Sequence, residues 1–129
     1  MGSEFTFYEY VDSGGRSFVG PWLRNDVSAT VRAKFHKWML NLEGMPLAMW
    51  SMPMVKPVGG GLFQLRTHGQ SRQQYRILFT HTPNQRPTLL HGFFKPDKKL
   101  PPGDRAVAQA RRVALLANRD EHQVEYRYD

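Results

Sequence analysis

The fold of this 129-residue chain is decided by residues 61–119, which read GLFQLRTHGQSRQQYRILFTHTPNQRPTLLHGFFKPDKKLPPGDRAVAQARRVALLANR. Three runs within this stretch are rich in aliphatic and aromatic residues and are separated by turn residues, which is typical of strands. They are Leu62–Arg66, Gln74–Thr80 and Thr88–Phe94. A link rich in lysine and proline follows, and Asp104 is then expected to cap a helix. The stretch therefore predicts an antiparallel sheet with a helix packed on it.

The predicted last helix carries one apolar stripe and one polar stripe. Its apolar residues recur at i, i+1, i+4, i+7, i+8 and i+11, which is the spacing of a buried helix face: Ala106, Val107, Ala110, Val113, Ala114 and Ala117. On the opposite, cationic face we expect Arg105, Gln109 and Arg112. The pattern predicts that the apolar stripe is the buried one.

Upstream of this stretch the chain predicts a strand over residues 6–11 and then a helical hairpin. The first helix opens with Pro21 at its first position and ends near Asp26, and the second is capped by Ser28 and stopped by Gly44. The second helix has an apolar face that is expected to enter the core, made of Val27, Val31, Phe35, Trp38 and Leu42. Strand, helical hairpin, three strands and helix together indicate the α+β class.

Within the strand at 88–94, Gly92 indicates a bulge or a close approach of another group. Residues 45–61 are irregular and rich in methionine and proline, so they are expected to cap the core or, alternatively, to form an adaptable contact surface. Residues 1–5, MGSEF, match what two adjacent cloning sites encode and are interpreted as a cloning scar. We expect one domain over residues 6–119, followed at 120–129 by a polar tail or edge strand that adds little to the core.

Composition narrows the classes of function. The net charge of +7 and the pI near 10.1 favour polyanions, either nucleic acid or an acidic protein partner. Absence of cysteine excludes disulfides and thiolate metal sites, and it fits the reducing cytoplasm. No signal peptide and no apolar run of membrane-spanning length are visible, so no membrane association is expected. The five histidines are scattered, so no metal site is predicted.

A set of cations lies inside the predicted strands, and it is the best candidate for chemistry: Arg66, Arg76, His91 and Lys95. Cleavage of RNA without metal needs a base for the 2′-hydroxyl, a cation for the charge on phosphorus and an acid for the leaving oxygen. Arginine suits the second role, and histidine or desolvated lysine suits the others. Each residue also has a structural explanation: the arginines could pair with acidic residues across the sheet, and His91 could be a core histidine.

Three segments carry a resemblance to a known family: LFQLR at 62–66, YRILF at 75–79 and LLHGFFK at 89–95, followed by the Lys/Pro link and the Ala/Arg helix. This arrangement resembles the phage-derived, HigB-like branch of the RelE/ParE toxin superfamily over about residues 6–119. Two positions depart from the usual pattern of that branch: Gln64 stands where glutamate is usual, and Pro96 stands where a second lysine is usual.

The resemblance implies a small RelE-like fold and the toxin of a type II toxin–antitoxin system. Such toxins are mostly metal-independent mRNA endoribonucleases that act on ribosome-bound mRNA without a cofactor and are neutralised by a cognate, often helix-turn-helix, antitoxin. The matching positions give Arg76 for the scissile phosphate, Lys95 as base or second clamp and Arg66 for orienting RNA, with His91 as a weaker candidate. Further RNA contacts are expected from Arg72, Lys98, Lys99 and Lys56.

Two other functions stay open from the sequence. One is a ParE-like toxin that poisons DNA gyrase through protein binding and has no nuclease activity. The other is a degenerate homologue that only binds its antitoxin or RNA. A nuclease depends on the strand cations, whereas a gyrase poison depends on a protein-binding surface.

Overall fold

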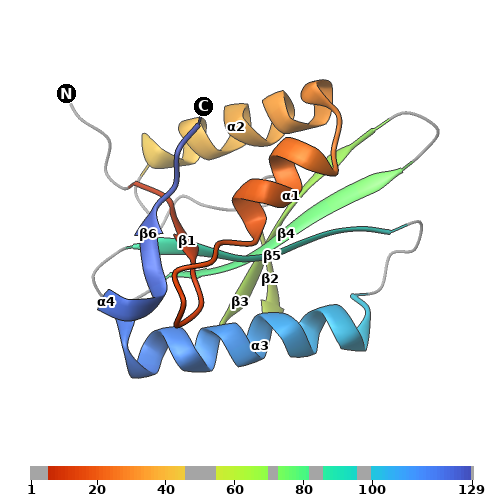
Figure 1. Ribbon diagram of the computed structural model, residues 1–129. Helices are drawn as coiled ribbons and strands as arrows, with labels where there is room; N and C mark the ends of the chain where they lie inside the picture. The colour runs from red at the N-terminus through yellow and green to blue at the C-terminus, as the bar shows by residue number, and fades with distance from the viewer. Residues whose placement is uncertain (1–5, 46–54, 70–72, 82–85, 96–99, 129) are drawn as a thin grey trace.

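The computed structural model describes residues 6–45, 55–69, 73–81, 86–95 and 100–128, and it confirms the α+β class (Figure 1). Within these residues one sheet has the strand order β2-β3-β4-β5-β1-β6. Its strands are β1 Tyr8–Tyr10, β2 Lys56–Gly59, β3 Leu62–His68, β4 Gln74–His81, β5 Pro87–Lys95 and β6 Gln123–Glu125. The helices are α1 Val19–Asn25, α2 Ala29–Glu43, α3 Pro102–Ala117 and α4 Arg119–His122.

The sheet is mixed rather than purely antiparallel. Strands β2 to β5 pair antiparallel, and so do β1 and β6, but β1 runs parallel to β5 with Tyr8 opposite Thr88. The prediction of an antiparallel sheet was therefore wrong for this one pair. Local patterning gave no sign of it, because β1 and β5 are joined only after the helical hairpin and three intervening strands.

Helices cover both faces of the sheet, with α1 and α2 on one face and α3 on the other (Figure 1). Each face has its own apolar core. The first core joins α1 and α2 to the sheet through residues such as Leu23, Phe35 and Phe79, and the second joins α3 to it through Leu78 and Leu115. Helix α2 is capped as predicted, since the Ser28 side chain accepts from the Val31 N–H.

The apolar face of α2 differs from the prediction at one position. Val31, Phe35, Met39 and Leu42 are buried, whereas Trp38 is half-buried and lies outside the core. Met39 occupies the place expected for Trp38, because one residue further along a helix rotates the side chain by about 100° toward the sheet. Trp38 thus faces the rim of α2 rather than its packed side.

Helix α3 packs on the sheet with the face predicted to be its outer one. Val113 of the predicted apolar stripe is 63% exposed, and only Ala114 of that stripe is half-buried. The cationic face instead donates hydrogen bonds to the sheet side: Arg105 Nη2 to the Val58 carbonyl at 2.6 Å, Gln109 Nε2 to the Gly60 carbonyl at 3.0 Å, and Arg112 Nε to Thr80 Oγ1 at 3.3 Å. The apolar-stripe prediction was wrong because these two carbonyls and the Thr80 hydroxyl, distant in the chain, are invisible in the local pattern.

The start of α3 also differs from the prediction. Pro101 occupies the N-cap position and makes no side-chain cap, and Asp104 lies in the first turn. The Asp104 carboxylate is engaged elsewhere, since it lies 2.6 Å from Nε2 of His91 on β5. Asp104 is therefore not the cap; it joins the helix to the sheet.

The C-terminal residues are docked against the rest of the fold. Strand β6 pairs with β1, which agrees with the edge strand that the sequence allowed. Tyr126 is only 4% exposed, its N–H donates to the Phe7 carbonyl at 2.9 Å, and its hydroxyl lies 2.6 Å from Nε2 of His36. The expectation that residues 120–129 add little to the core was wrong.

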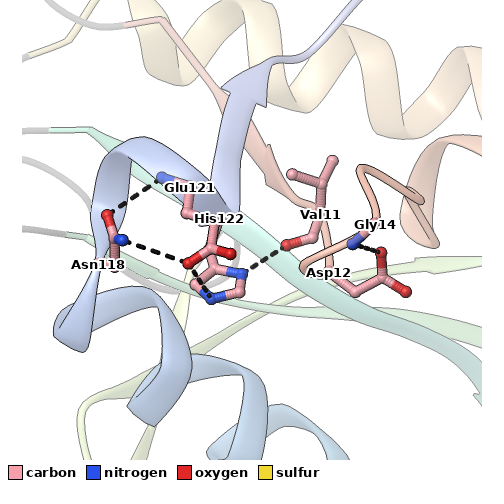
Figure 2. Close-up of polar contacts among 6 residues, drawn as sticks. All are labelled: Val11, Asp12, Gly14, Asn118, Glu121 and His122. Carbon is pink, nitrogen blue, oxygen red and sulfur yellow. Dashed lines mark hydrogen bonds and ion pairs between the residues drawn. The ribbon is translucent and has the colours of Figure 1, made fainter.

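Helix α4 carries the chain from α3 into β6, as Figure 2 shows. The Asn118 side chain accepts from the Glu121 N–H at 3.3 Å and so caps α4. His122 Nδ1 lies 2.9 Å from the Val11 carbonyl, and because a carbonyl can only accept, Nδ1 carries the proton. These bonds explain how a polar segment with no periodic apolar face is nevertheless held in place.

Candidate functional site

Two of the predicted site residues lie directly opposite each other in the sheet. Arg66 on β3 pairs with Arg76 on β4, and on the other side Arg76 pairs with Phe93 on β5. Residues paired across strands point to the same face. Phe93 belongs to the core beneath α3, so the arginines lie on the α3 face. The two residues directly opposite Arg76 in the described strands, Arg66 and Phe93, are not acidic.

The pair places two like charges side by side. Arg76 is 2% exposed and donates from Nη2 to Gln74 Oε1 at 2.8 Å, whereas Arg66 is half-buried. Burial, and then the charge of Arg66, lower the pKa of Arg76 below its ordinary value. Like charges directly opposite each other destabilise a sheet. An anion bound at this point would relieve that repulsion.

His91 lies one row from Arg76 on the same face, opposite Leu78. Its Nε2 is 2.6 Å from Asp104 Oδ1, and its ring stacks on Phe93 with 5.5 Å between ring centroids. The His91 side chain is 19% exposed, so it is neither a fully buried core histidine nor a free surface one. The carboxylate accepts from Nε2, which fixes the ring and assigns the basic lone pair of the neutral ring to Nδ1.

The register of β5 explains the placement of its site residues. The irregularity in the β4–β5 ladder lies opposite Leu78 and Phe79, at Leu90, and not at Gly92. Gly92 instead allows the close approach that the sequence suggested, because a Cβ there would overlap the indole ring of Trp22. Lys95 ends the strand with its backbone opposite Gln74, two residues from Arg76 along β4. The side chain of Lys95 lies outside the described part of the structure.

The remaining RNA-binding candidates divide into two groups. Lys56 is exposed at the start of β2, with its backbone opposite Gln64. Arg72, Lys98 and Lys99 lie outside the described residues. The structure thus brings together Arg66, Arg76 and His91 and does not test the other candidates.

Sequence reasoning missed a second group of cations beside Arg66. Lys34, Lys37, Trp38 and Asn41 on α2 line a groove of about 480 Å³ together with residues 66–68 of β3. Lys34 Nζ donates to the His68 carbonyl at 2.9 Å and so joins α2 to β3. The signal in the sequence was the spacing of Lys34, Trp38 and Asn41 at i, i+4 and i+7, which places them on one helix face.

No group of three or more His, Asp or Glu side chains in the described residues could hold a metal ion. No described helix is long and apolar enough to cross a membrane.

The family relationship follows from comparison with known proteins. No curated protein matches the chain. Residues 22–113 match the family described as phage-derived proteins that are Gp49-like (DUF891). The matched range holds the second half of α1, all of α2, strands β2 to β5 with Arg66, Arg76 and His91, and most of α3. The chain therefore belongs to the phage-derived Gp49-like family, a family of the RelE/HigB toxin type.

Proposed function

We propose that this protein is the toxin of a type II toxin–antitoxin system and that it cleaves ribosome-bound mRNA without a metal. Membership of the Gp49-like family is consistent with such a toxin and suggests an antitoxin partner. The observation that carries the nuclease assignment is the pairing of Arg66 with Arg76 on adjacent strands, one row from the His91–Asp104 pair. Two guanidinium groups and an oriented imidazole are the groups that phosphodiester transfer needs.

The proposed reaction moves two protons and exchanges one bond at phosphorus. A base takes the proton from the 2′-hydroxyl, the 2′-oxygen attacks phosphorus, and the bond to the 5′-oxygen breaks as an acid protonates that oxygen. Nδ1 of His91 suits the base, since Asp104 holds the other ring nitrogen. Lys95 is the second candidate for base or for a charge clamp.

The arginines supply the electrostatic stabilisation in this scheme. Arg66 is the more accessible of the two and would contact the phosphate first. Arg76 is 2% exposed, so it stabilises the phosphate through its charge at a distance. It would contact the phosphate directly only if the side chains that cover it moved. A guanidinium binds phosphate oxygens through two parallel hydrogen bonds, which an ammonium cannot do.

One observation favours a second function, a homologue that binds antitoxin or RNA but does not cleave. The same burial of Arg76 would hold that side chain as a structural part of the sheet. On this reading Arg76→Ala unfolds the protein and Arg76→Lys restores it, whereas the nuclease reading predicts folded Arg76→Ala without activity.

The experiment combines cleavage of mRNA in a translating extract with a melting curve for each variant. Arg66→Ala should reduce the cleavage rate by about 10²- to 10³-fold, the usual effect of removing one transition-state donor, at an unchanged melting temperature. Arg127→Ala removes an exposed arginine at the far end of the chain and serves as the matched control. Wild-type cleavage by folded Arg66→Ala and Arg76→Ala would exclude the proposed site.

Expression in bacteria tests the toxin assignment separately. Induction should arrest growth through loss of translation, and coexpression of an antitoxin should relieve the arrest. Induction of DNA damage with intact mRNA would indicate the gyrase-poisoning alternative instead.

A further inference from the structure

The groove between α2 and β3 has the composition of a nucleotide-binding surface. Its described lining contains the cations Lys34, Lys37 and Arg66, one large aromatic ring and one side-chain amide, and it includes no aspartate or glutamate. Its volume of about 480 Å³ lies within the range of small-ligand pockets, about 300–1,000 Å³. A groove of this size is large enough for a nucleotide.

Trp38 is placed in this groove by the geometry of α2. The buried side of the helix is formed by Val31, Phe35, Met39 and Leu42, and Trp38 projects beside it, between Lys34 and Asn41 along the helix. A half-buried tryptophan offers an indole surface on which any base can stack. The core does not need this ring, since Met39 fills the corresponding place.

The groove opens on an unpaired part of the sheet edge. Strand β2 pairs with β3 only as far as Gln64, so no described strand lies beyond residues 66–68. Lys34 uses one of its three N–H donors on the His68 carbonyl, and two remain for other acceptors. Arg66 is among the residues that line the groove, and its side chain lies with that of Arg76 on the α3 face, so the groove and the paired arginines meet across the edge of β3.

We propose that this groove binds single-stranded RNA where the strand passes around the edge of β3 from the bond that is cut, with a base stacked on Trp38 and the adjoining phosphates held by Lys34 and Lys37. The choice of RNA as the ligand rests on the proposed function. An acidic protein would satisfy the lysines equally well, but it would not account for an aromatic ring and the Asn41 amide between them. Stacking on an aromatic ring between backbone-tracking cations is the usual way in which single strands are bound.

Binding can be measured apart from cleavage with a fluorescently labelled 2′-O-methyl RNA of about ten nucleotides, because its blocked 2′-oxygen cannot attack phosphorus. The Lys34→Ala, Lys37→Ala double variant should lower the slope of log affinity against log salt by about 1.4, which is 0.7 for each phosphate contact to a single strand. Trp38→Leu should weaken binding by about fivefold or more, and Trp38→Phe should retain most of it.

The matched control is the Arg16→Ala, Arg127→Ala double variant, which removes the same charge from exposed positions outside the groove. Three outcomes would each refute RNA binding in the groove. They are an equal change of slope in the control, unaltered binding by the lysine and Trp38→Leu variants, and equally tight binding of duplex RNA. Competition by polyglutamate at the same charge concentration would indicate a protein partner and refute it too. If the wild-type protein binds the labelled RNA in the groove but does not cleave mRNA, the result would count against the proposed function alone.

Discussion

Deletion of residues 126–129 should strongly destabilise this protein, although the segment is short, polar and terminal. Tyr126 is 4% exposed among the residues of the core between the sheet and the helical hairpin. Its ring also meets His36 and Tyr128 edge-on. The Tyr128 hydroxyl donates to Glu43 Oε2 at 2.6 Å, and that carboxylate also accepts from the Phe7 N–H at 3.0 Å.

The size of the effect follows from these contacts. Truncating a buried aromatic side chain costs about 3–5 kcal/mol through lost transfer energy and the cavity left behind. Loss of the Tyr128 donor leaves the buried Glu43 carboxylate with one partner fewer, which costs about 1–3 kcal/mol more. We therefore expect a loss of at least about 4 kcal/mol, a large part of the 5–15 kcal/mol typical of a folded domain.

Urea denaturation followed by circular dichroism measures this loss directly. Tyr126→Phe should cost only about 1 kcal/mol, because it removes the hydroxyl near His36 and keeps the ring. Arg127→Ala, which alters an exposed residue between the two tyrosines, should stay within about 0.5 kcal/mol of wild type. A deletion that costs less than about 1 kcal/mol would show that the docking of this segment contributes no stability and would refute the reasoning.

Three further predictions concern other parts of the fold. Gly92→Ala should cost about 1–3 kcal/mol in urea denaturation because the new Cβ overlaps Trp22, whereas Gly103→Ala, which meets no atom within 4 Å, should not destabilise; equal effects would contradict this packing. Val113→Ala should change the free energy of unfolding by no more than about 0.5 kcal/mol, since Val113 is 63% exposed. A loss as large as that for a buried side chain would instead support the buried face that the sequence predicted for α3. Burial raises the pKa of Glu9 above 4.5, although the Gly20 N–H bond and the charge of Arg24 act in the opposite direction. The ionised carboxylate is therefore disfavoured in the folded state, and the contribution of Glu9 to stability should fall as pH rises above 4.5. Glu9→Gln should abolish this contribution, and identical pH profiles of stability for the variant and the wild type would contradict it.

Local sequence was sufficient for most of the elements. The strands β3, β4 and β5, the two helices of the hairpin and the cap at Ser28 lie within a few residues of where the patterns placed them, because turn residues and side-chain periodicity act over a few residues. The predicted start of the first helix at Pro21 was wrong, since α1 begins at Val19. The conjunction of Arg66, Arg76 and His91 on one sheet was also predictable, since each lies within a strand that the sequence marks. The catalytic role of these residues stays a prediction.

Tertiary structure alone decided which surfaces these elements turn toward one another. The sequence could not show that Arg105, Gln109 and Arg112 would hold α3 to the sheet, because their acceptors on Val58, Gly60 and Thr80 lie far away in the chain. These hydrogen bonds lie on the same side of α3 as its buried residues Ala108 and Leu115, and most of the predicted apolar stripe is left in solvent. Likewise the like-charged pair of Arg66 and Arg76 exists only through the β3–β4 register, and the groove at Trp38 only through the packing of α2 against β3. Periodicity thus determined which residues share an element, whereas long-range contacts determined which face of each element was buried.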